Sequence, residues 1–137
     1  MTDFPAAFDR FVDLFERGEY WASHEALEAP WRRNGSRFYH GLILFASAFV
    51  HVERGNPHGI DAQLRKAERA LEPFRPTYHG LDVEALLDHA RRCRRIVAER
   101  RDEEGDDVDW SDLVPRFRLV PDPELVRGDE PELTEGA

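Results

Sequence analysis

Hydrophobic residues recur at helical spacing in five successive stretches of the first 102 residues. In the first stretch, Phe8, Phe11, Val12 and Phe15 follow the i, i+3, i+4, i+7 pattern, and Gly18 stands where a helix commonly ends. The pattern therefore predicts a short amphipathic helix before Gly18.

Two longer helices are expected over about residues 19–33 and 37–54, joined by a turn at Asn34-Gly35-Ser36. Pro30 is expected either to kink the last turn of the first of them or to end it, because proline lacks the backbone donor for the bond back to Ala26. The second is apolar nearly all round, which predicts the most buried element of the fold. Its apolar positions are Leu42, Ile43, Leu44, Phe45, Ala46, Ala48, Phe49, Val50 and Val52.

The last two predicted helices begin at residues that commonly cap helices. Asn56 precedes Pro57, which suits a first helical position, and Pro73 and Pro76 end that helix. A loop is expected over residues 73–81, and Asp82 caps the fifth helix. The apolar faces of these two helices are Ile60, Leu64, Ala67 and Leu71, and then Leu86, Leu87, Ala90, Cys93 and Val97.

These elements predict an all-α fold, a single compact bundle of about five helices built from two helical hairpins plus a C-terminal helix. Residues 1–102 form the domain, and residues 103–137 form an acidic, proline-containing tail that is partly docked or disordered. Arg17-Gly18-Glu19 is echoed 37 residues later by Arg54-Gly55-Asn56, so the two hairpins are similar and are expected to pack in a tetratricopeptide-like way.

The net charge of -9 belongs to the tail, because residues 1–102 carry 16 acidic and 16 basic side chains whereas residues 103–137 carry 12 and 3. A basic run near the end of the fifth helix is interpreted as a solvated face, so nucleic-acid binding is disfavoured. No apolar run is long enough to span a membrane and no export signal is recognised, so a cytoplasmic location is expected. The basic run comprises Arg91, Arg92, Arg94, Arg95, Arg100 and Arg101.

A polar pair stands in the middle of an aromatic stripe on the second predicted helix. At 100° per residue, Trp21, Glu28 and Trp31 fall within about 60° of His24. Burying an imidazole and a carboxylate without partners costs several kcal/mol, so other groups must lie against them.

The third predicted helix has its own polar line, with His40, Ser47 and His51 at i, i+7 and i+11. Small residues beside this line, Gly41 and Ala48, are expected to admit the preceding helix. Eleven residues of helix rise about 16 Å, so only one histidine can meet His24. Pairing about the intervening turn selects His51.

Three interpretations of this cluster stay open. His24, Glu25, Glu28 and His51 could bind a divalent metal. Alternatively, His24 could act as a general base oriented by Glu28, on a ligand held between Trp21, Trp31 and Tyr39. In the third interpretation, His24 and Glu28 only fix how the helices pack.

Several separated motifs resemble a small prokaryotic family called domain of unknown function 309. They are Arg17-Gly18-Glu19-Tyr20, His24-Glu25-x-Leu27-Glu28-x-x-Trp31, Phe38-Tyr39-x-Gly41-Leu42-Ile43 and His51-x-x-Arg54-Gly55-Asn56. The resemblance implies a compact all-helical fold with no assigned activity. Two residues depart from the family pattern: Pro30 replaces an ordinary helix former, and His40 stands where glutamine is common.

Two functions are therefore hypothesised. The first is a small-molecule- or metal-binding protein or enzyme that uses the cluster between the second and third helices. The alternative is a non-enzymatic helical interaction module, self-associating into a homo-oligomer, in which the cluster is structural. A solvent-connected cavity at the cluster would favour the first, and a fully bonded cluster with an exposed apolar face elsewhere would favour the second.

Overall fold

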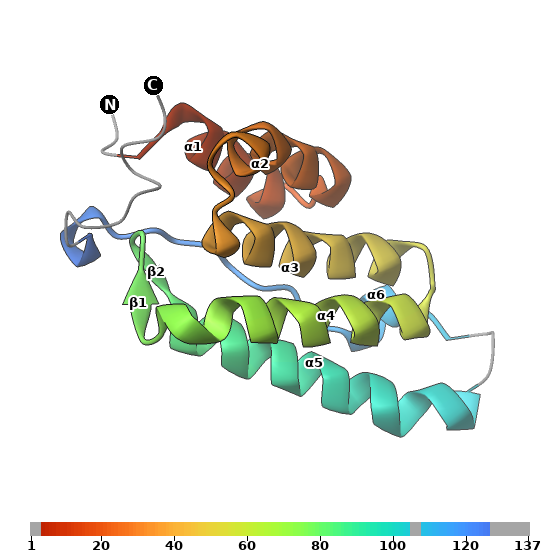
Figure 1. Cartoon of the computed structure of the whole chain (residues 1–137). Coiled ribbons are helices and arrows are strands. Elements are labelled where there is room, and N and C mark those ends of the chain that lie inside the picture. Colours follow the sequence, from red (N-terminus) through yellow and green to blue (C-terminus); the bar gives the residue numbers. More distant parts are fainter. Residues whose placement is uncertain (1–3, 105–107, 127–137) are drawn as a thin grey trace.

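The computed structural model describes residues 4–104 and 108–126, and these form a helical bundle (Figure 1). The five predicted helices are confirmed, and the only sheet in the described residues is a two-stranded hairpin. The helices are α1 (Ala6–Glu16), α2 (Tyr20–Asn34), α3 (Arg37–Glu53), α4 (Pro57–Leu71), α5 (Val83–Glu104) and the short α6 (Trp110–Leu113).

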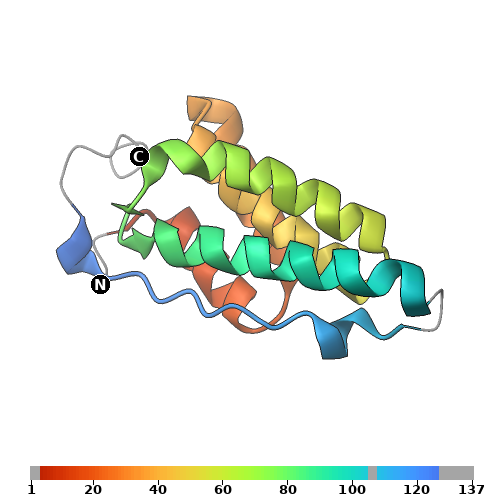
Figure 2. The same ribbon diagram turned by 90° about the horizontal axis from the view of Figure 1, so that it is seen from below.

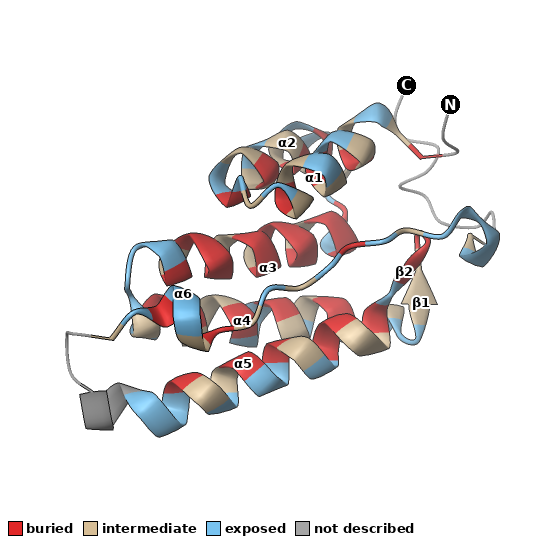
Figure 3. Ribbon diagram, turned by 180° about the vertical axis from the view of Figure 1, so that it is seen from behind, coloured by how far each residue is buried: buried red, intermediate tan, exposed pale blue. Residues whose placement is uncertain are grey.

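From α2 to α5, each helix packs against the one before it. The helix α3 therefore lies in the middle, with α2 on one side and α4 on the other. Most of α3 is buried, as its apolar sequence predicts (Figure 3). Its partly exposed residues are Leu44 and the three members of the polar line identified from the sequence, His40, Ser47 and His51.

The helix ends follow their local chemistry. The Ser36 hydroxyl accepts a hydrogen bond from the Tyr39 amide at 3.1 Å, and the Asn56 side chain accepts one from the Gly59 amide at 3.1 Å. Pro30 lies inside α2, which continues to Asn34 and ends at Gly35 in the left-handed conformation. Of the two outcomes expected for Pro30, ending the helix is therefore excluded.

Two glycines bring α3 and α4 close together. A Cβ added to Gly41 would lie 2.7 Å from Leu71 Cδ2 and 3.3 Å from Ala70 Cβ, both on α4. Near the opposite end of the pair, a Cβ on Gly59 would overlap the His51 ring. The prediction that Gly41 admits the preceding helix was wrong, because Gly41 faces α4 and not α2.

The predicted loop at residues 73–81 contains some regular structure. It includes the short 3-10 helix η1 (Glu72–Phe74) and an antiparallel hairpin of β1 (Thr77–Tyr78) and β2 (Leu81–Asp82). His79, at the turn of this hairpin, is buried among aromatic rings, and its Nε2 lies 3.3 Å from the Tyr39 hydroxyl. The loop therefore closes one end of the core.

Part of the predicted tail lies along the bundle beside α5, on the side away from α4 (Figure 2). Trp110, Val114 and Leu119 are buried, and the segment ends in the 3-10 helix η3 (Pro123–Leu125). Glu16 of α1 receives a hydrogen bond at its carboxylate from the Leu119 amide, at 2.8 Å. Residues 105–107 and 127–137 of the predicted tail lie outside the described residues.

None of the described helices combines the length and the apolar character needed to cross a membrane. The cytoplasmic location stays a prediction.

Replacing Gly41 with valine should destabilise the fold, because the new side chain would overlap Leu71, which is itself buried. Overpacking of this kind typically costs about 1–3 kcal/mol, and we expect a loss of that size in the free energy of unfolding measured with urea. Ser47→Val, at a partly exposed position of the same helix, is the matched control and should change it by less than about 1 kcal/mol. Equal losses in both variants would contradict the close approach.

Stability should fall as the pH drops below the ordinary histidine value, partly through His89. Its Nε2–H donates to the Pro115 carbonyl at 2.8 Å. Burial lowers its pKa from 6.5, the Pro115 bond opposes this, and Arg92 lowers the pKa further. Because the unfolded chain binds this proton more tightly, the stabilisation present above pH 6.5 is lost as the pH falls toward the folded-state pKa.

The measurement is the free energy of unfolding from about pH 7 to about pH 5. His89→Gln keeps a donor for Pro115 and should make this dependence shallower. Burial also lowers the pKa of His40 and His51, so part of the slope should remain. An unchanged slope in His89→Gln would contradict the prediction.

Candidate functional site

The predicted pair His24 and Glu28 lies on α2, one turn apart. His24 Nδ1 is 3.3 Å from Glu28 Oε1, but this contact is not a well-aligned hydrogen bond, because Nδ1 has no hydrogen-bond partner among the described residues. The other Glu28 oxygen accepts from Arg32 Nη2 at 2.8 Å. Both members of the pair are about three-quarters buried, so the carboxylate is paired within its own helix and still reaches solvent.

Trp21 is an exposed aromatic side chain beside this pair. Its ring stacks on His24 with 5.2 Å between centroids, and 53% of the residue is exposed. The Arg54 guanidinium, at the end of α3, lies 5.4 Å from the centre of the Trp21 ring, within the range of a cation–π contact. We call Trp21, His24, Glu28, Arg32 and Arg54 the Trp21 patch.

Trp31 lies further along α2 and contacts α3. It stacks on His40 with 4.5 Å between ring centroids and 3° between the planes. Burial lowers the pKa of His40, and the charge of Lys66 on α4 lowers it further, so the neutral ring is favoured. The contact between Trp31 and His40 therefore joins α2 to α3, and Trp31 takes part in helix packing.

His51, the expected partner of His24, faces α4. Its ring packs against Gly59, and its Nδ1 lies 3.2 Å from the Asn56 side-chain nitrogen. No group of three or more His, Cys, Asp and Glu residues in the described part of the chain could hold a metal ion. The residues expected to bind a metal, His24, Glu25, Glu28 and His51, therefore do not form such a group, and the His51 ring packs on Gly59 of α4.

Tyr39 does not flank the Trp21 patch. It is buried in the core, where its ring contacts Phe8 and its hydroxyl meets His79. Of the three residues expected to wall a ligand pocket, Trp21 is thus exposed, Trp31 stacks on His40, and Tyr39 belongs to the core.

Four cavities of about 230–320 Å³ lie elsewhere on the described surface. Three of them are lined partly by the tail, and the fourth lies on α4 and α5. His24 and Glu28 line none of these four. A His–carboxylate pair can accept a proton from a bound molecule, but a catalytic role for His24 and Glu28 stays a prediction.

Two residues that make contacts between different segments of the chain, Arg54 and His89, were not identified from the sequence. Arg54 was considered only as part of a turn motif, and its contact with Trp21 depends on how α2 and α3 pack. His89 had a usable signal, because it lies three residues after Leu86 and four before Cys93, on the apolar face of α5. Its ring packs against Phe117 of the tail, at 5.0 Å between centroids.

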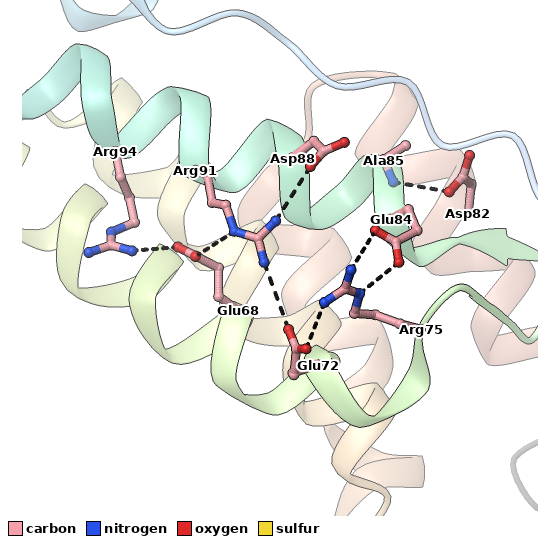
Figure 4. A network of polar contacts seen from close by, with 9 residues as sticks. All are labelled: Glu68, Glu72, Arg75, Asp82, Glu84, Ala85, Asp88, Arg91 and Arg94. Atoms are coloured by element: carbon pink, nitrogen blue, oxygen red, sulfur yellow. Dashed lines mark hydrogen bonds and ion pairs between the residues drawn. The ribbon is translucent and has the colours of Figure 1, made fainter.

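The basic run of α5 is paired with α4 and not only solvated (Figure 4). Arg94 Nη1 donates to Glu68 at 2.8 Å, and Arg91 lies within ion-pair distance of Glu68, Glu72 and Asp88. The side chain of Arg101 lies outside the described residues. Part of the run therefore stabilises the contact between these two helices.

Comparison with known proteins agrees with the motifs of the first three helices. Residues 8–62 match the family model described as a domain of unknown function (DUF309). No functionally curated protein and no solved structure is significantly similar to the chain.

Removing the charge of Glu28 should have a small effect on stability. Glu28→Gln weakens two contacts within one partly exposed helix, and such pairs contribute about 0.3–0.5 kcal/mol each. We expect the free energy of unfolding to fall by less than about 1 kcal/mol, measured by urea denaturation. Glu25→Gln, at an exposed neighbouring position, is the control. A loss several times larger would contradict the pairing described for Glu28.

Proposed function

We propose that this chain, which belongs to the DUF309 family through residues 8–62, is a non-enzymatic helical interaction module that self-associates through the Trp21 patch. The observation that carries the proposal is the exposure of Trp21, which is stacked on His24 and capped by Arg54 without being covered by other described residues.

The chemistry of the patch suits a protein interface. Tryptophan and arginine are the residue types that most often contribute strongly to binding, and an exposed tryptophan loses unfavourable contact with water when a partner covers it. The stack on His24 and the contact with Arg54 hold the indole ring in one orientation. A held side chain loses less conformational entropy on binding than a free one, which favours association.

The polar members of the patch support a structural role for the cluster. Glu28 is paired with Arg32 and contacts His24, and the described cavities are lined by other residues. The arrangement therefore resembles a paired, solvent-accessible surface more than a walled reaction site.

A second copy of the chain is the partner that the charges favour. The patch carries Glu28 close to Arg32, and Arg54 stands on the neighbouring helix. In a two-fold dimer the same surface meets itself, so acidic groups of one copy can face basic groups of the other. Because a patch centred on one tryptophan is small, the association should be weak and dependent on concentration.

Analytical ultracentrifugation of the full chain over a range of concentrations tests this proposal. We expect a reversible dimer for the native chain and a monomer for Trp21→Ala. Urea denaturation at low protein concentration should show little change in stability for this variant, because its side chain is more than half exposed.

Val120→Ala is the matched control, because Val120 is an exposed apolar residue of the tail, with 68% of its surface accessible. This variant should dimerise like the native chain. A native chain that stays monomeric at every concentration would overturn the proposal, as would a Trp21→Ala variant that dimerises equally well.

A further inference from the structure

A hollow of about 320 Å³ on the surface of α4 and α5 is lined mainly by arginines. Arg65 comes from α4, and Arg91, Arg94 and Arg95 come from successive turns of α5. Asp61 and Ala98 complete the lining. The hollow therefore gathers four guanidinium groups from two helices around one carboxylate.

The carboxylates nearby are shared unequally among these arginines, and most of them pair with Arg91 and Arg94. Glu68, which is mostly buried, pairs with Arg94 at 2.8 Å and contacts Arg91 at 3.7 Å. Arg65 pairs with Asp61 of its own helix and keeps more than half of its side chain exposed. Arg95 is exposed and makes no ion pair with the described residues. Arg65 and Arg95 thus leave donors directed to solvent at this surface.

Asp61 holds two of the arginines in place. Its carboxylate accepts from Arg65 Nη2 at 3.0 Å and from Arg94 Nε at 3.2 Å. Burial raises the pKa of Asp61, but the hydrogen bonds from Arg94 and Arg65 outweigh it and leave the pKa below its ordinary value. Arg94 uses Nε for Asp61 and Nη1 for Glu68, which fixes its guanidinium plane and leaves Nη2 available.

We propose that this hollow binds a small phosphate-bearing anion, with Arg65 and Arg95 as the principal ligands and Arg94 as a fixed third donor. Guanidinium groups donate pairs of hydrogen bonds to phosphate oxygens, and several of them around one hollow match an anion that has many acceptors. Because Asp61 and Glu68 already hold Arg94, binding requires little further ordering of that side chain.

The size of the anion follows from the charges around the hollow. Glu72, which directly follows α4, and Asp88 of α5 lie beyond the hollow, and the whole chain carries a net charge of -9. A long polyanion that continued beyond the hollow would meet these carboxylates, whereas a compact anion would not. We therefore assign the site to a small molecule and not to a nucleic-acid backbone.

Isothermal titration of the full chain with inorganic pyrophosphate tests the site. We expect one saturable site in the native chain and a loss of affinity of about tenfold or more in Arg95→Gln and in Arg65→Gln. Both side chains are exposed, so urea denaturation should show that the variants fold normally. Arg33→Gln, which removes an exposed arginine from α2 outside the Trp21 patch, should bind pyrophosphate like the native chain.

Three outcomes would overturn the proposal. They are no saturable binding by the native chain, equal losses in Arg33→Gln and Arg95→Gln, or tighter binding of a short DNA duplex than of pyrophosphate with Arg95→Gln weakening both. The site is independent of the Trp21 patch, because the patch lies on α2 and at the end of α3, whereas the hollow lies on α4 and α5. Trp21→Ala should therefore leave pyrophosphate binding unchanged. If one of the two proposals fails, the other is not affected.

Discussion

The close approach of α3 and α4 is the constraint on which the rest of the structure depends. Gly41 accommodates Leu71 near one end of the pair, and Gly59 accommodates the His51 ring near the other. Between them, α3 presents its partly exposed polar line in the angle between α2 and α4. This packing places the His51 ring against Gly59 of α4.

The sequence predicted the helices well because their signals are local. The capping side chain of Asn56 and the apolar periodicity of α1 both act within a few residues, and both reappear in the structure. The choice of neighbour for each helix face was less predictable. Gly41 signals that some helix comes close, but a missing side chain does not indicate which helix that is.

In the candidate site too, the sequence predicted contacts within one helix better than contacts between helices. Spacing on one helix correctly placed Trp21 and His24 side by side, with Glu28 one turn later. The role of each aromatic residue depended on contacts between helices, which spacing does not give. Trp31 stacks on His40 of α3, whereas Trp21 keeps 53% of its surface exposed. The family match extends over these helices but assigns no chemistry to them.

The packing of the tail on α1 and α3 affects the order in which the core forms during synthesis. Phe117 packs against Phe45 of α3 with 5.6 Å between ring centroids, and Arg116 donates to the Glu16 carbonyl, 100 positions earlier in the chain. Helices that contact their sequence neighbours can form as they emerge, but the contact between Phe45 and Phe117 forms only after residue 117 has been made. The central helix therefore gains this part of its apolar cover only after α1 to α5 have all been synthesised.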